Sequence, residues 1–387
     1  MPPQDSVEIV DAKELVIDKR TGKIRQAGSS QEGQYLQMVR QRCERSLYVF
    51  SKLVLGNKWL SPTLHKPTAD WIQKTPPRRK MLLLPRGHGK TILGGQSLVC
   101  HMLIQPTETN VYFPGSPGSD TRILLIGENL DRAKDHVRVI STHLESNDLL
   151  RALWPQVVWD NPRRDSKRWN ETEIIIPRSQ EFSDPTLRGV GLGAAITGAH
   201  PTVLIKDDLT TKDAANSEVM MRDAIEYHVA SRALAGRTED LEFIYATRWT
   251  VHDLPGFILA NDPSVAVMTR GVVENGKPIW PENPSFSLER IEDLKREFGT
   301  LFPLLYMNSA TDRSLTDFDP ADIREFRVDQ LTNTFLFEED ERDARLRMGM
   351  ARTDFNAKMV KDELYGQRFN GETFERMRLQ HLRRVRA

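Results

Sequence analysis

A lysine and a threonine end a glycine-bearing segment that reads Pro85-Arg86-Gly87-His88-Gly89-Lys90-Thr91. Glycines let backbone N–H groups converge on phosphate oxygens, and a helix that begins here would present its N-terminus to the same anion. In such a loop, Arg86 to Gly89 would surround the phosphates, Lys90 would bind the β- and γ-phosphates of ATP, and Thr91 would place its hydroxyl on Mg²⁺. Leu84 occupies the place of the first glycine of the full motif. The segment by itself is therefore also compatible with a surface turn.

Two adjacent carboxylates, Asp207 and Asp208, end a second apolar segment that begins at Thr202. Asp207 would hold Mg²⁺ through its water shell, and Asp208 would orient or deprotonate the attacking water. A solvated turn is the alternative, but Lys90 and Thr91 elsewhere in the chain favour the catalytic interpretation. Asp208 is one methylene shorter than the glutamate more usual at this place.

A third apolar segment, 243–246, ends in Thr247, Arg248 and Trp249. Thr247 could sense the γ-phosphate and report its hydrolysis. Arg248 and Trp249 are equally well explained as structural residues, since a guanidinium can cap a cluster of carbonyls and an indole can fill core.

The elements that must position these residues follow from the spacing of apolar side chains. Short apolar runs at 80–84, 122–126, 172–176, 202–205, 242–246 and 265–269 alternate with longer polar or helical stretches. Apolar steps of three and four predict helices over 35–55, 64–71 and 90–104. This alternation predicts an α/β fold of the P-loop type, with a mainly parallel central sheet flanked by helices. We expect a polar arm at 1–34, an ATPase domain with a helical lead-in at 35–311, and a linker with a charged tail at 312–387.

Composition narrows the class of protein. The 387 residues are 39% hydrophobic and 28% charged, a globular balance, and the 54 Lys and Arg are matched by 54 Asp and Glu. With no net charge, any contact with DNA must come from a local basic patch. Cys43 and Cys100 form neither a zinc motif nor a disulfide framework. No apolar run is long enough to span a bilayer, so we expect a cytosolic protein without a membrane contact.

Several motifs in this order resemble the ATPase domain of phage terminase large subunits. Pro85 to Thr91 is similar to their phosphate loop, in which an arginine precedes Gly-Lys-Thr. Further similar segments follow over roughly residues 45 to 320, at 184–189, 196–200, 204–209, 247–256, 280–281 and 288–307. The resemblance implies an ASCE-type ATPase that forms a homo-oligomeric ring on the portal protein and drives double-stranded DNA into the prohead without sequence preference. It also implies a small terminase subunit as partner, and a location in the host bacterial cytoplasm and transiently at the portal vertex.

The resemblance further implies an arginine finger. Arg188 matches the arginine that acts from a neighbouring subunit in some members of the family, and Arg86 matches the one proposed for that role in others. We favour Arg188, for which a local salt bridge is the alternative.

The chain departs from the family after Pro320, where too few residues follow for the usual nuclease domain. The acidic run Glu338 to Glu341 is best interpreted as a solvated charge run. We therefore expect no DNA cleavage by this chain, and a separate nuclease polypeptide as partner. The tail at 372–387 could be a docking helix or a solvated terminus. Two other functions remain open at this point, a helicase-like nucleic-acid ATPase and a non-hydrolysing nucleotide-binding scaffold of the packaging machine.

Overall fold

The computed structural model describes residues 30–76, 78–215 and 217–310, and two strands at 326–329 and 334–337. The chain divides into two compact units, Met1–Thr311 and Asp312–Ala387. In the second unit, β10 (Phe326–Asp329) and β11 (Thr334–Phe337) pair antiparallel. The predicted acidic run at 338–341, the tail at 372–387 and most of the polar arm lie outside the described residues.

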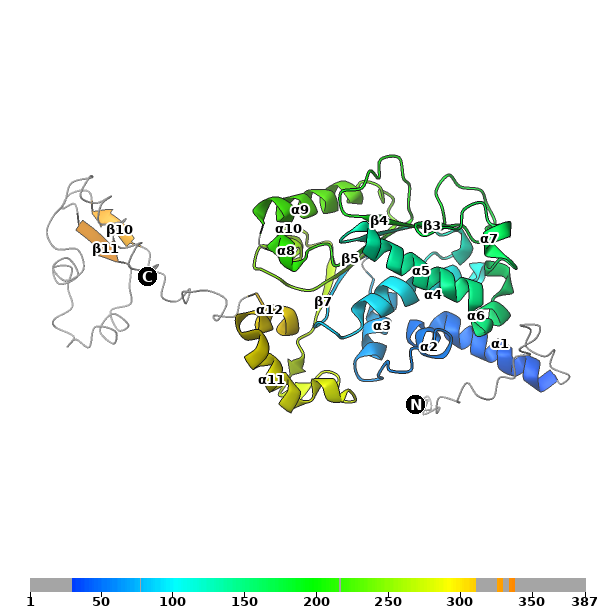
Figure 1. The fold of residues 1–387 in the computed structure, drawn as a ribbon, viewed down its shortest axis with the longest axis horizontal. Coiled ribbons are helices and arrows are strands. Elements are labelled where there is room, and N and C mark those ends of the chain that lie inside the picture. Colours follow the sequence, from blue (N-terminus) through cyan, green and yellow to red (C-terminus); the bar gives the residue numbers. More distant parts are fainter. Residues whose placement is uncertain (1–29, 77, 216, 311–325, 330–333, 338–387) are drawn as a thin grey trace. The chain divides into compact units, whose positions relative to one another are not determined.

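The first unit is built on a seven-stranded sheet in the order β3-β4-β2-β5-β6-β1-β7 (Figure 1). Every pairing is parallel except that of β3 with β4. The strands are β1 (Arg79–Leu83), β2 (Ile123–Gly127), β3 (Glu173–Ile174), β4 (Leu187–Gly191), β5 (Val203–Asp207), β6 (Leu241–Ala246) and β7 (Ala266–Thr269). The predicted α/β fold with a mainly parallel sheet is thereby confirmed.

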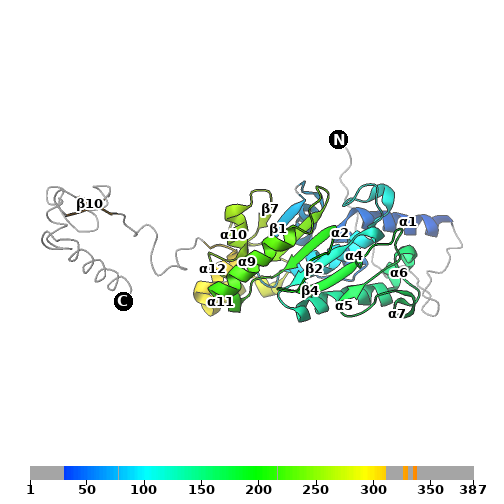
Figure 2. The ribbon, with the colours of Figure 1, turned by 90° about the horizontal axis from the view of Figure 1, so that it is seen from above.

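Helices cover both faces of this sheet (Figures 1 and 2). They are α1 (Ser30–Arg45), α2 (Leu47–Leu53), α3 (His65–Lys74), α4 (Leu98–Leu103), α5 (Leu130–Ser146), α6 (Asp148–Leu153), α7 (Pro162–Asp165), α8 (Lys212–Ala215), α9 (Glu218–Arg232), α10 (Leu254–Asn261), α11 (Leu288–Phe298) and α12 (Phe302–Met307). Alternate residues of a strand face opposite layers, so Leu82 packs toward α1 to α6, whereas Met81 packs toward α9 and α10. Among the described helices, none is long and apolar enough to cross a membrane.

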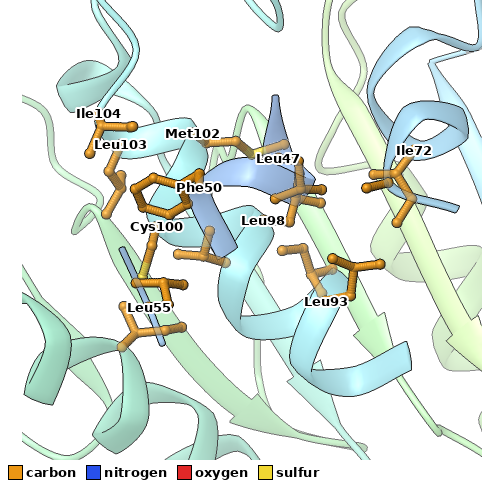
Figure 3. Close-up of a cluster of buried hydrophobic side chains, with 14 of the residues drawn as sticks. Leu47, Phe50, Leu55, Ile72, Leu93, Leu98, Cys100, Met102, Leu103 and Ile104 are labelled. Carbon is orange, nitrogen blue, oxygen red and sulfur yellow. The ribbon is translucent and has the colours of Figure 1, made fainter. Parts of the chain in front are cut away.

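The helical lead-in packs against the helix that follows the phosphate loop. Figure 3 shows Leu47, Phe50 and Ile72 of α2 and α3 beside side chains of that helix, in a cluster that also includes Leu93 and Leu98. The predicted helix over 35–55 is interrupted at Ser46, whose side chain accepts a hydrogen bond from the Val49 amide and caps α2. The lead-in helices therefore support the phosphate loop by packing against the helix that follows it.

Strand β4 was not predicted, because its sequence Leu-Arg-Gly-Val-Gly lacks a continuous apolar run. Its glycines serve packing. A Cβ on Gly189 would lie 2.9 Å from a methyl of Val137, and one on Gly191 would lie 2.5 Å from the Leu130 amide. Both neighbours belong to α5, so the glycines let this helix lie directly on the strand.

The helix after the phosphate loop makes an equally close approach. Its first part, Thr91–Ser97, is a π-helix that continues into α4. A Cβ on Gly94 would overlap the Tyr245 ring of β6, and one on Gly95 would lie 2.8 Å from His136 Cε1. Short π-helical segments within α-helices are frequently found at functional sites.

We expect Gly94→Ala to lower the free energy of unfolding by about 1–3 kcal/mol, because the new methyl group overpacks the Tyr245 ring. Gly33→Ala in α1 is the matched control, since nothing lies within 4 Å of its Cβ position. That replacement should be neutral or stabilising by up to about 1 kcal/mol. Urea unfolding of both variants measures the difference, and equal effects would contradict the close contact at Gly94.

Candidate active site

The C-terminal ends of β1, β6 and β5 lie side by side at one edge of the parallel sheet. Leu83 pairs with Ala246 across β1 and β6, and Asp207 pairs with Tyr245 across β5 and β6. The phosphate loop follows β1, the paired acids Asp207 and Asp208 lie at the end of β5, and Thr247 follows β6. All three therefore lie at this edge of the sheet.

Lys90 joins these three segments through its side chain. Its Nζ lies 2.9 Å from Asp208 Oδ2 and donates to Thr247 Oγ1 at 2.5 Å. Lys90 and Thr247 are both buried. A buried ammonium needs such partners, because an unpaired charge in the interior costs several kcal/mol.

Asp207 is held on both of its oxygens. Thr91 donates its hydroxyl to Oδ1 at 3.3 Å, and His136 Nε2 lies 3.0 Å from Oδ2. His136 was not predicted as a site residue. The one feature of the sequence that could have indicated His136 is its position on the buried face of α5, among Ala133, Val137 and Ile140. One polar side chain in an apolar stripe is an exception that requires a partner.

Asp208 has an unusual backbone. Its φ of 47° lies in the left-handed region, and its amide donates to the Tyr245 carbonyl at 2.8 Å. Oδ1 is buried and has no hydrogen-bond partner within the described part of the chain. Burial raises the pKa of Asp208, and the adjacent Lys90 ammonium acts in the opposite direction. The side chain as a whole still exposes 37% of its surface, so one oxygen is buried while the remainder borders a cavity.

The phosphate loop owes its shape to two glycines and a histidine. Gly87 and Gly89 have φ values of 81° and 73°, which L side chains rarely adopt. The His88 ring packs 4.1 Å from the Phe286 ring and 5.7 Å from that of Trp280, centroid to centroid. Burial lowers the pKa of His88 to about 4, so this imidazole is neutral at neutral pH. His88 thus anchors the loop by its side chain and contributes only backbone to a ligand.

A cavity of about 930 Å³ opens beside these residues. Its volume is at the upper end of the range typical for small-molecule sites, roughly 300–1,000 Å³. Its walls include the loop from Arg86 to Thr91, both aspartates, Thr247 and the ring systems of Trp59, Trp249 and Trp280. Glu128, the first residue after β2, also lines it and was not predicted. The sequence offered no signal for Glu128 beyond its place at a strand end.

The two candidate arginine fingers lie in different places. Arg86 is exposed, lines the cavity and stacks its guanidinium 5.5 Å from the centre of the Trp249 ring. Arg188 lies on β4, two strands away from β5, and does not line the cavity. Its Nε lies 3.5 Å from Glu173 Oε1. The salt bridge considered as the alternative for Arg188 is present, and a role in a neighbouring subunit stays a prediction.

Arg248 stabilises the turn after Thr247. Its Nε donates to Asp253 Oδ1 at 2.9 Å, and its Nη2 donates to the carbonyls of Thr250 and Val251. Asp253 in turn caps α10 by accepting from the Gly256 amide. The interpretation of Arg248 as a carbonyl cap is confirmed. Trp249 is partly buried and packs against a core cluster that includes Val272 and Phe302, and it also borders the cavity.

The basic clusters of the sequence are largely neutralised locally. Arg163, Arg164, Lys167 and Arg168 each form an ion pair with a nearby carboxylate. Arg78 donates to main-chain carbonyls at the opposite edge of the sheet. The role of these clusters in binding DNA stays untested.

The donor set suits a magnesium-bound nucleoside triphosphate. Two glycines in left-handed conformation line the cavity together with Lys90, and the Thr91 hydroxyl, which also lines it, lies beside the Asp207 carboxylate. Magnesium is commonly bound by one or two carboxylates together with substrate phosphates, so few protein ligands suffice.

No family model matches the sequence, and no curated protein matches it. Among solved structures, the chain is similar to the large terminase of bacteriophage HK97, with 13% identity and a TM-score of 0.40 over 79% of this chain and 68% of that one. It is also similar to the large terminase of a thermophilic bacteriophage in complex with ADP, with 10% identity and a TM-score of 0.35 over 80% and 78% of the two chains. Identities and TM-scores as low as these do not establish a function for this chain.

We expect Asp253→Ala to lower the free energy of unfolding by about 3–5 kcal/mol, because it leaves the buried Arg248 guanidinium without its carboxylate. Asp293→Ala is the matched control, since Asp293 forms an exposed ion pair with Arg296 three residues away. Such exposed pairs contribute about 1 kcal/mol or less. Thermal and urea unfolding distinguish the two, and a loss below about 1 kcal/mol for Asp253→Ala would contradict the role of the buried pair.

Proposed function

We propose that this chain is the ATP-hydrolysing motor of a phage DNA-packaging terminase and translocates double-stranded DNA. The observation that supports an ATPase most strongly is the meeting of three distant motifs at one cavity, through Lys90, Asp208 and Thr247. The packaging role rests on the order of motifs along the chain, which resembles that of terminase large subunits. The portal protein and a small terminase subunit are the partners that this role requires.

In the proposed site the loop amides and Lys90 would bind the triphosphate, and Thr91 and Asp207 would hold the magnesium ion. When bound, the ion neutralises charge on the phosphate oxygens. Lys90 must then exchange its contact with Asp208 for one with the phosphates. This exchange frees the Asp208 carboxylate to orient the attacking water and accept its proton. Thr247, which shares Lys90 with Asp208, would detect the change.

The arginine finger would come from a neighbouring subunit of a ring. Arg188 is our candidate, because it lies away from the cavity of its own chain and leaves its 36%-exposed side chain partly free. Arg86 is the second candidate, because it borders the cavity of its own chain. A finger spreads positive charge over the transferring phosphoryl group.

We expect ATP hydrolysis that rises with protein concentration and with duplex DNA, and that Lys90→Ala and Asp208→Asn each abolish. Steady-state phosphate release by the full chain measures it, and filter or fluorescence assays confirm that Asp208→Asn still binds nucleotide. Nucleotide binding without turnover under any condition, portal and DNA included, would favour the scaffold instead. Unwinding of a forked duplex would favour a helicase.

We expect Arg188→Ala to keep nucleotide binding and to lower the rate of hydrolysis by a factor on the order of 10³. Arg168→Ala is the matched control, because Arg168 also pairs with Glu173 but has no proposed role. Mixing Arg188→Ala with Lys90→Ala chains should restore turnover, since each supplies what the other lacks at a shared interface. Full turnover by Arg188→Ala alone would refute the assignment.

A further inference from the structure

We propose that His136 is the positioning residue of the magnesium site, which it serves by fixing the carboxylate of Asp207; this rests on the proposed ATPase function. Within the described chain, Asp207 Oδ2 is bonded by His136 and Oδ1 by Thr91. The two carboxylate oxygens of Asp207 therefore have different surroundings. Oδ1 faces the hydroxyl beside which the ion would bind, and Oδ2 is committed to the protein.

The imidazole is held in place from both sides. The side chain of Asn129 caps the N-terminus of α5, and the helix lies against β4 through the glycines of that strand. On the other side the ring rests on Gly95 of the π-helix, where even a methyl group would come within 2.8 Å of Cε1. His136 therefore has little freedom to turn away from Asp207.

The hydrogen bond has a defined direction. A carboxylate only accepts, so Nε2 must carry the proton that joins His136 to Asp207. Nδ1 is buried and has no hydrogen-bond partner among the described residues. Among the described residues, the bond from Nε2 to Asp207 is therefore the hydrogen bond that fixes the orientation of the ring.

The role differs from that of a histidine that supports the fold alone. His101 is also buried, but its ring bonds the Cys43 carbonyl and the Tyr112 hydroxyl and does not line the cavity. His136 lines the cavity and contacts the one carboxylate assigned to the ion. Hydrogen-bond partners of metal ligands typically contribute 10- to 100-fold in metal affinity.

The test is the binding of a fluorescent ADP analogue to the full chain as a function of Mg²⁺ concentration. We expect His136→Ala to raise the Mg²⁺ concentration for half-maximal binding about 10- to 100-fold, and to leave the affinity in EDTA unchanged. His136→Gln, whose amide can donate from nearly the position of Nε2, should recover part of the loss. His143→Ala is the control, because His143 lies on the same helix, bonds Asn147 and does not line the cavity.

The same assay distinguishes a wrong role for His136 from a wrong ATPase function. An unchanged Mg²⁺ dependence of His136→Ala or, if that variant does not fold, of His136→Leu, which fills the space of the ring but cannot donate to Asp207, would overturn the positioning role while leaving the ATPase intact. A loss of affinity already present in EDTA would also overturn it, since the histidine would then act on the nucleotide or the fold. A wild-type chain that binds no nucleotide at any Mg²⁺ concentration would overturn the proposed function as well.

Discussion

One ammonium group connects the three segments from which the site is built. Lys90 follows β1, and its Nζ binds both Asp208, which follows β5, and Thr247, which follows β6. In the sheet, β6 lies between β1 and β5 and all three strands run parallel, so their C-terminal ends meet at one edge. Because a buried cation is costly without partners, the order of the sheet and the conformation of the loop are tied to each other. The left-handed backbone of Asp208 directs its carboxylate to this meeting point.

Glycines allow the helices that flank the site to pack closely against the sheet and against each other, which brings His136 to the same edge. Gly94 and Gly95 let the first turn of the loop helix contact Tyr245 and His136, and the glycines of β4 let α5 lie on the sheet. A helix placed this near can carry His136 to Asp207. Gly94 and Gly95 both lie within the π-helical segment Thr91–Ser97.

Features that depend on local sequence patterns could be predicted, whereas contacts between residues far apart in the sequence could not. Apolar runs predicted most strands, and the shared edge of parallel strands explains why Lys90, Thr91, Asp207 and Thr247 meet; their chemical roles stay predictions. Strand β4 was not predicted because glycine is rare in strands, and here two glycines allow the close contact with α5. His136 is far from Asp207 in sequence, and no pattern links a buried histidine to a particular carboxylate. The place of Arg188 outside its own cavity likewise depends on strand order.

The most direct measurement is an experimental structure of the full chain with Mg²⁺ and a non-hydrolysable ATP analogue. The account predicts the triphosphate against the loop from Arg86 to Thr91, with Lys90 moved from Asp208 onto the phosphates and Asp207 on the magnesium side. It would be contradicted by a nucleotide bound elsewhere, or by a phosphate-loaded loop in which the ion pair between Lys90 and Asp208 is unchanged.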